Sequence, residues 1–196
     1  IAFTGSKDVG LGMVQAAAAH QLGQRFVKRV IAEMGGKNAI IVDDTADLDE
    51  AVIGVVQSFT SYAGQKCSAC SRVIVLESIY EAFIQRLADA VMSLRIGAAE
   101  DPATQLGPVI DERAQQRIRA YLEIGRCEGR VVVDRSMEGP GYALGPVVIA
   151  DIEPVHRLAQ EEIFGPVLAV MRAASYEQAL QLANGTAYAL TGGLYS

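Results

Sequence analysis

Residues 26–42, FVKRVIAEMGGKNAIIV, decide the fold, because two apolar runs flank a pair of glycines. The first run, residues 26–33, is rich in β-branched side chains and predicts a strand that Gly35 and Gly36 end. The second run, residues 39–42, predicts a buried strand. The glycine pair offers a flexible hinge, so we expect a domain boundary at this point.

Apolar runs alternate with segments of helical periodicity on both sides of this stretch. Asp47 is the expected N-cap of the next helix, and Gly64 its stop. The expected helices cover residues 9–22, 47–62, 78–94, 111–127 and 175–184, and the other expected strands cover residues 1–4, 71–76, 131–133, 147–149 and 166–171. This alternation predicts an α/β fold with a parallel or mixed sheet that helices cover on both faces.

Composition is typical of a globular protein of one to two domains, with 196 residues, 51% hydrophobic and 20% charged. The net charge is −6 and the densest basic stretch is the pair Lys28 and Arg29, so we expect no nucleic-acid partner. We expect no membrane association, because no apolar run approaches the roughly 18 residues of a spanning helix. The chain opens at Ile1 in a strand-like run, from which we expect an internal fragment of a longer protein.

Three cysteines, Cys67, Cys70 and Cys127, form an odd set. A secreted disulfide framework usually has an even and denser set, so we expect a reducing, cytoplasmic location. We expect no metal site, because Cys67 and Cys70 lack a second pair of ligands at suitable spacing. A redox dithiol formed by these two residues is an alternative, although Cys70 is most simply a core residue.

Cys67 and Glu33 are the candidate catalytic residues. Cys67 lies in a polar, glycine-led turn beside Lys66, which could favour the thiolate. The alternative is a small core residue at a helix end. Glu33 ends an apolar run before two glycines, where a carboxylate at a cleft floor could act as a base. These residues alone favour a surface carboxylate instead.

Two further segments have the composition of a nucleotide site. Residues 5–12, GSKDVGLG, join a strand to a helix, where backbone N–H groups can hold a pyrophosphate. They match neither G-x-G-x-x-G nor the P-loop, and a plain turn is equally consistent with them. Residues 161–166, EEIFGP, combine two acids with an aromatic, which could bind a ribose diol and line a nicotinamide site. An ordinary loop is the simpler interpretation of that segment.

The order and spacing of four motifs resemble the aldehyde dehydrogenase superfamily: FTGS (residues 3–6), EMGGK (33–37), GQKC (64–67) and EEIFGPV (161–167). The resemblance runs over essentially all 196 residues. It implies an aldehyde dehydrogenase-like α/β fold. Residues 1–35 would be the C-terminal part of a Rossmann-like NAD-binding domain. Residues 36–196 would be the catalytic, thiol-bearing domain, truncated at its C-terminal end.

The resemblance also implies roles for individual residues. Cys67 would attack an aldehyde to give a thiohemiacetal, hydride would pass to NAD, and Glu33 would activate water to hydrolyse the thioester. The backbone N–H of Cys67 would form half of an oxyanion hole, and Ser68 would help to hold a substrate carboxylate. The family's cofactor positions fall on six residues of this chain: Gly5, Ser6, Gly10, Gly35, Glu162 and Phe164.

Within the superfamily, residues 36–43, 65–69 and 118–129 are similar to the enzymes that oxidise L-glutamate γ-semialdehyde to L-glutamate in proline catabolism. An NAD(P)-dependent enzyme for another aldehyde is the nearest alternative, and a non-catalytic scaffold on the same fold is a second. The family's upstream oxyanion asparagine, adenosine contacts and downstream oligomerisation segment are not in these residues. We therefore expect the chain alone to be inactive and the full-length protein to be a homo-oligomer.

Overall fold

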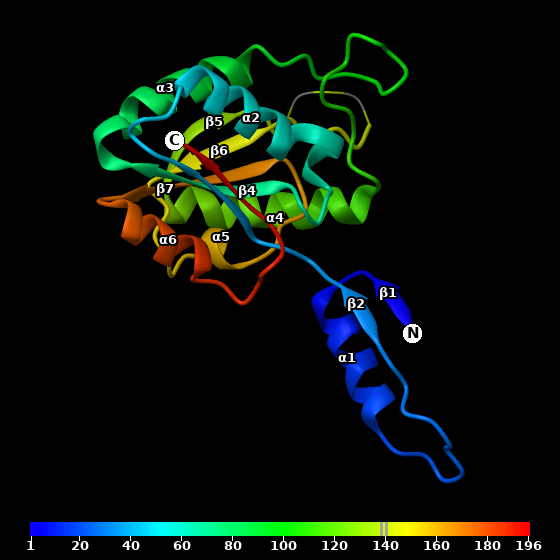
Figure 1. Ribbon diagram of the computed structural model, residues 1–196. Helices are drawn as coiled ribbons and strands as arrows, with labels where there is room; N and C mark the ends of the chain where they lie inside the picture. Colours follow the sequence, from blue (N-terminus) through cyan, green and yellow to red (C-terminus); the bar gives the residue numbers. More distant parts are fainter. Residues whose placement is uncertain (138, 140) are drawn as a thin grey trace.

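The computed structural model describes residues 1–137, 139 and 141–196, and its main body is a six-stranded mixed sheet (Figure 1). The strand order is β5-β6-β7-β4-β3-β8. β5 is antiparallel to β6, and the other neighbouring strands are parallel. The expected α/β class is confirmed. The strands are β3 (Asn38–Val42), β4 (Cys70–Leu76), β5 (Arg130–Asp134), β6 (Val147–Ala150), β7 (Val167–Ala173) and β8 (Gly192–Tyr195).

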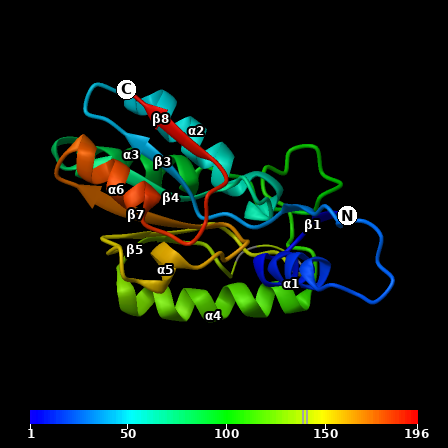
Figure 2. The same cartoon turned by 60° about the horizontal axis from the view of Figure 1, so that its bottom comes forward.

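Helices cover both faces of this sheet, as the alternation predicts (Figures 1 and 2). One face carries α2 (Leu48–Thr60) and α3 (Tyr80–Met92). The other face carries α4 (Glu112–Glu128), the short α5 (Arg157–Gln160) and α6 (Tyr176–Asn184). Two 3₁₀ turns, η1 (Ser61–Gly64) and η2 (Glu77–Ile79), join helices to strands.

Alternation of side chains along the strands divides the apolar core in two. In β4, Val73 and Val75 pack with Phe83 on the side of α2 and α3. Ile74, between them, packs with Ile118 on the side of α4. The side chains on both faces of the sheet are fully buried at these positions, which explains why the sequence of the strand is a continuous apolar run.

The expected starts of three helices, α2, α4 and α6, are confirmed by capping hydrogen bonds. The Asp47 side chain accepts from the N–H groups of Asp49 and Glu50 at the start of α2. Asp111 caps α4 and Ser175 caps α6 in the same way. Each cap satisfies backbone donors that the first turn of a helix leaves free.

A smaller unit precedes the main sheet and extends away from it in Figure 1. It consists of the parallel strands β1 (Ala2–Thr4) and β2 (Ile31–Glu33) and the helix α1 (Lys7–Ala18). The expected strand over residues 26–33 is wrong for its first five residues, because β1 pairs only with the three residues of β2. The exposed side chains of Phe26 and Val27 confirm the absence of a packed strand there.

Three other expectations from the sequence need correction. α1 ends at Ala18 rather than near residue 22, because the chain then turns and Gly23 adopts a φ of +85°. The four-residue α5 was not expected as an element, and the end of the chain, expected only to lie within some element, is the strand β8. β8 lies in the sheet because its backbone pairs with β3, although its own glycines give little strand propensity. Within the described residues, none of the helices is both long and apolar enough to cross a membrane.

Arg72 ties one helix to the centre of the sheet. This residue of β4 is only 2% exposed. Its Nε and Nη2 donate to the Lys37 carbonyl at 3.0 and 2.7 Å. Its Nη1 and Nη2 donate to the carbonyls of Leu182 and Ala183, both at 2.8 Å. These last two lie near the C-terminal end of α6, whose partial negative charge stabilises the guanidinium.

Replacement of Arg72 by Met should lower the melting temperature of the native protein. The variant leaves the buried Lys37 carbonyl without its donor, which costs about 1–3 kcal/mol, and also releases the end of α6. Differential scanning calorimetry would measure the shift. Arg113→Met, on the exposed surface of α4, is the matched control and should leave the transition in place. Equal melting temperatures for the two variants would contradict the assigned role.

Candidate active site

Parallel strand directions bring three distant segments to one edge of the sheet. β3, β4 and β7 lie side by side and run the same way. The segments that enter them, residues 34–37, 65–69 and 161–166, therefore meet at the same edge. These segments contain most of the candidate site residues.

The glycine pair passes between two of these segments in close contact. A Cβ atom at Gly35 would collide with the carboxylate of Glu162, and a Cβ atom at Gly36 would lie 2.5 Å from the Cys67 carbonyl oxygen. The Gly36 N–H also donates to Glu162 Oε1 at 3.0 Å. Only glycine has the space to run between the carboxylate and the cysteine loop. The structure thus brings Gly35, Glu162 and Cys67 together.

Asn38 fixes the backbone around Cys67. Its Nδ2 donates to the carbonyls of Cys67 and Ala69 at 2.7 and 2.8 Å. Its Oδ1 accepts from the Thr191 N–H at 3.1 Å. A buried amide with this many partners holds the cysteine loop against the start of β3 and the approach to β8.

The two neighbouring cysteines occupy different environments. Cys67 is exposed in the turn before β4. Cys70 is 3% exposed, and its Sγ donates to the Arg72 carbonyl at 3.3 Å. Burial raises the pKa of the Cys70 thiol to about 12. The interpretation of Cys70 as a core residue is confirmed, and its thiol is a poor partner for redox exchange.

Glu161 and Glu162 are adjacent in sequence but have different hydrogen-bond partners. Glu161 accepts from the Tyr121 hydroxyl at 2.6 Å and from Arg157 through two bonds of 2.8 Å. The Arg157 guanidinium, followed by Tyr121, lowers the pKa of Glu161 to about 2. Glu162 instead faces the glycine pair through its bond to the Gly36 N–H. Of the two acids, Glu162 is the one presented at the strand entrance.

Glu33 lies exposed at the end of β2, and its backbone joins the glycine-rich turn. The Gly5 N–H donates to the Glu33 carbonyl at 3.0 Å. Gly5 and Ser6 are exposed before α1, whereas Gly10 is buried. A Cβ at Gly10 would lie 2.7 Å from Met34 Sδ, so the contact seen at Gly10 is packing of α1 on the segment after β2.

Phe164 and Ser68 line different cavities. Phe164 is 37% exposed with a φ of +58°, and it lines one cavity with Glu162 and Lys66. Ser68 is exposed and lines a second cavity of about 250 Å³ with Asn38 and other residues. The two candidates therefore border separate hollows around the cysteine loop.

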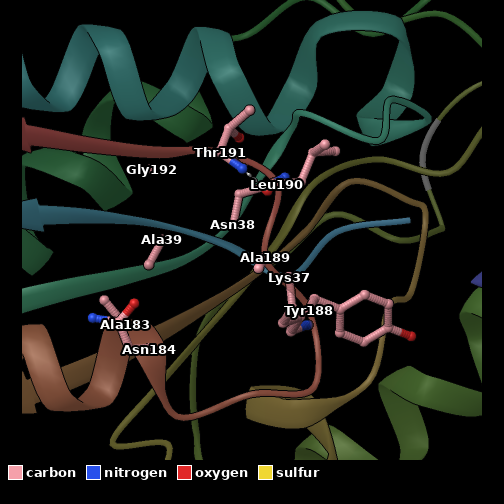
Figure 3. Close-up of a pocket in the computed structure, with 10 residues that line it drawn as sticks. All are labelled: Lys37, Asn38, Ala39, Ala183, Asn184, Tyr188, Ala189, Leu190, Thr191 and Gly192. Carbon is pink, nitrogen blue, oxygen red and sulfur yellow. Dashed lines mark hydrogen bonds between the residues drawn. The ribbon is translucent and has the colours of Figure 1, made fainter. Parts of the chain in front are cut away.

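Two lysines at this edge were not singled out by the sequence. Lys7, in α1, donates to the Ala187 carbonyl at 3.1 Å and lies 5.0 Å from the centre of the Tyr188 ring. It connects α1 to the loop after α6. Lys37, directly after the glycines, is buried and lines a cavity of about 260 Å³ together with Tyr188 and Asn184 (Figure 3).

A family model described as the aldehyde dehydrogenase family matches residues 1–196. The chain belongs to the aldehyde dehydrogenase family. The resemblance carried by the four motifs is therefore confirmed.

Relatives within this family cover the whole chain. The chain is 46% identical to 1-pyrroline-5-carboxylate dehydrogenase from Geobacillus thermodenitrificans, over 100% of the chain and 38% of that protein. A solved 1-pyrroline-5-carboxylate dehydrogenase from Thermus with bound NAD has a TM-score of 0.96 at 46% identity, with the same coverage. Proline utilization A from Bdellovibrio bacteriovorus gives 0.96 at 48% identity over 100% of the chain and 20% of that structure. The chain spans about 38% of the length of its curated relatives.

Several residues of the candidate site were not predicted from the sequence, although the sequence contains a signal for some of them. Lys37 and Asn38 are polar residues at the entrance to a buried apolar run, and Arg72 is a charge inside another. Polar groups in such positions need partners, so each predicts a local network without naming its members. Lys7 and Tyr188 have no such signal, because their contact depends on how α1 sits against the loop after α6.

Iodoacetamide should alkylate Cys67 and leave Cys70 intact in the native protein. Cys67 is exposed, whereas the Cys70 thiol is buried and has its pKa raised to about 12. A Cys127→Ser background removes the other exposed thiol. Mass spectrometry of peptides would give the two rates, and denaturant provides the control in which both thiols react. Comparable native rates would contradict the assignment.

Proposed function

We propose that this chain is the thiol-bearing part of an NAD-dependent dehydrogenase that oxidises L-glutamate γ-semialdehyde to L-glutamate. The observation that carries the proposal is the passage of Gly35 and Gly36 between Cys67 and Glu162. Support for the substrate comes from the similarity to 1-pyrroline-5-carboxylate dehydrogenases. The proposal concerns the intact protein that carries the chain, because the chain spans about 38% of those relatives.

The residues present fit a bound NAD. Gly35 leaves room for the Glu162 carboxylate, which retains acceptor capacity for a ribose diol beyond its bond to the Gly36 N–H. Gly5 and Ser6 are exposed at the N-terminal end of the 12-residue α1, where backbone donors favour a phosphate. Phe164 supplies an apolar ring beside Glu162. On this assignment residues 1–35 belong to the NAD-binding domain and residues 36–196 to the catalytic domain.

The chemistry then follows from the chain's own residues. The Cys67 thiolate forms a bond to the aldehyde carbon, and its backbone N–H donates to the oxygen that becomes negative. NAD, when bound, accepts the hydride that leaves this carbon. Glu33 removes a proton from the water that attacks the resulting thioester, so that the acid leaves and the thiol is restored. Ser68 holds the carboxylate of the substrate.

Cellular context follows from the same assignment. Three unpaired thiols fit a reducing compartment, and we place the intact enzyme in the cytoplasm. The partner is a small aldehyde. A homo-oligomer is proposed for the intact protein on the family resemblance.

Substitution of Cys67 and Glu33 should separate the two halves of the reaction in the intact protein. Cys67→Ser should abolish NADH formation from glutamate γ-semialdehyde. Glu33→Gln should permit a first burst of NADH and then slow turnover by about 10²–10⁴-fold, the usual contribution of a general base. Absorbance at the NADH band, in stopped-flow and steady state, records both effects.

The control for these substitutions is Cys70→Ser, which should keep full turnover. Activity that survives Cys67→Ser but not Cys70→Ser would reverse the assignment of the nucleophile. Faster turnover of uncharged aliphatic aldehydes than of glutamate γ-semialdehyde would contradict the substrate assignment. The assignment as an aldehyde dehydrogenase would remain.

Alanine substitutions in the glycine pair should affect different partners. Gly35→Ala displaces the Glu162 carboxylate and should raise the dissociation constant for NAD, with little change in alkylation of Cys67. Gly36→Ala displaces the Cys67 backbone and should change the alkylation rate. Gly12→Ala is the matched control, since an added Cβ there meets nothing within 4 Å and gains up to about 1 kcal/mol of helix stability. Identical effects of the first two variants would argue against two separate contacts.

A further inference from the structure

Lys37 is a buried cation whose ammonium has no assigned task. The residue is 2% exposed, and its Nζ has no hydrogen-bond partner among the described residues. A lysine that serves only to pack its stem normally extends its head group to water. Burial of an unpartnered ammonium is costly, so its retention calls for a compensating charge.

The charged groups that face Lys37 come from three segments. Arg72 of β4 repels it while donating to its backbone carbonyl, and the Cys70 thiol lies at the start of the same strand. Glu162 and Glu161, from the segment before β7, attract it. Tyr188, from the loop after α6, shares its cavity (Figure 3).

Of the two acids, Glu162 is the one whose charge is free to act on Lys37, and it does so across a gap, because the Lys37 ammonium forms no hydrogen bond among the described residues. Glu161 is already held by Arg157 and Tyr121. Glu162 accepts from the Gly36 N–H, the group directly before Lys37 in the chain. Gly36 and Lys37 are consecutive, so one short segment supplies both a hydrogen bond and a positive charge to one carboxylate.

We propose that Lys37 is a positioning residue whose ammonium keeps the Glu162 carboxylate directed at the cofactor ribose. The inference rests on the proposed role of Glu162 in NAD binding. The Gly36 N–H holds one carboxylate oxygen, and the buried positive charge opposes rotation of the group away from the strand entrance. Loss of the charge loosens this hold without removing the hydrogen bond.

The attraction between the Lys37 ammonium and the Glu162 carboxylate should depend on pH near neutrality. Burial, and then Arg72, lower the pKa of Lys37 to about 7. Neighbouring groups with shifted pKa values titrate elsewhere: Glu161 at about 2, Arg72 at about 10 and Cys70 at about 12. Burial also raises the pKa of Tyr188 above its usual value. NAD should therefore bind more tightly at pH 6.5, where Lys37 is mostly charged, than at pH 8.5.

Isothermal titration of NAD into the intact protein tests the proposal. Lys37→Met should weaken binding about tenfold at pH 6.5, the effect of an attraction worth one pKa unit, and much less at pH 8.5. Glu162→Gln should also weaken binding, and adding Lys37→Met to it should cause no further loss. Arg119→Met, which removes an exposed cation from α4, is the control and should bind as the unsubstituted protein does.

The outcomes distinguish this inference from the proposed function. Absence of NAD binding by the unsubstituted protein would overturn both. Binding that Glu162→Gln weakens and Lys37→Met does not would overturn the inference alone. Additive losses in the double variant would also overturn it, since Lys37 would then act through another group.

Unfolding measurements provide a second readout that needs no cofactor. An unfolded lysine keeps its proton up to about 10.5, the usual pKa, whereas folded Lys37 releases it near 7. The unfolded state binds more protons between these values, so the stability of the native protein should rise with pH over this window. Lys37→Met should lose that component and be the more stable protein at pH 6.5. A Lys37→Met protein that is equally destabilised at every pH would assign the residue to packing.

If Lys37→Met fails to fold, a comparison between two proteins that retain Lys37 still tests the inference. Unsubstituted protein and Glu162→Gln both retain Lys37, and only the first should change its NAD affinity between pH 6.5 and 8.5. The same pH dependence in both proteins would overturn the inference.

Discussion

The close passage of two glycines between a carboxylate and a cysteine loop is the constraint on which this site depends. Gly35 and Gly36 have no space for side chains, because Glu162 lies on one side and the Cys67 carbonyl on the other. The hydrogen bond from the Gly36 N–H to Glu162 fixes the spacing. A shift of this segment would disturb both neighbours, since Glu162 packs against Gly35 and bonds the Gly36 N–H, and the Cys67 backbone carbonyl packs against Gly36.

Sheet topology explains why segments so distant in sequence are in direct contact. Glu162 and Gly36 are 126 residues apart, yet each lies just before a strand of one parallel set. Parallel strands place all their entrances at one edge, and the crossover helices return the chain to that edge each time. Arg72 reinforces this edge from within, because it joins the Lys37 carbonyl to the end of α6.

Much of this architecture could be predicted from periodicity and capping chemistry. The start of α2 follows from Asp47, whose side chain bonds local backbone donors, and this kind of information lies within a few residues. The strand over residues 26–33 was over-predicted for the opposite reason. β propensity describes side chains that fit a sheet, but only pairing with β1 decides where β2 begins.

The site was predictable as a set of residue types and not as a set of contacts. The family resemblance selects Glu162 over Glu161 as the cofactor residue, and the structure adds a physical reason, because Arg157 and Tyr121 already hold Glu161. The strands that set those positions are buried on both faces. Their sequences therefore lack the alternation from which register could be read.

The pairing of charged groups is the remaining feature that links stability to chemistry at this edge. Arg72 has carbonyl partners for its donors, and Glu161 has a cation and a hydroxyl. Lys37 and Glu162 are the two charged groups left incompletely satisfied by these networks, on either side of one peptide segment. An apolar residue at position 37 would pack at lower electrostatic cost. The lysine is therefore better explained by what it does to the neighbouring carboxylate than by what it contributes to the fold.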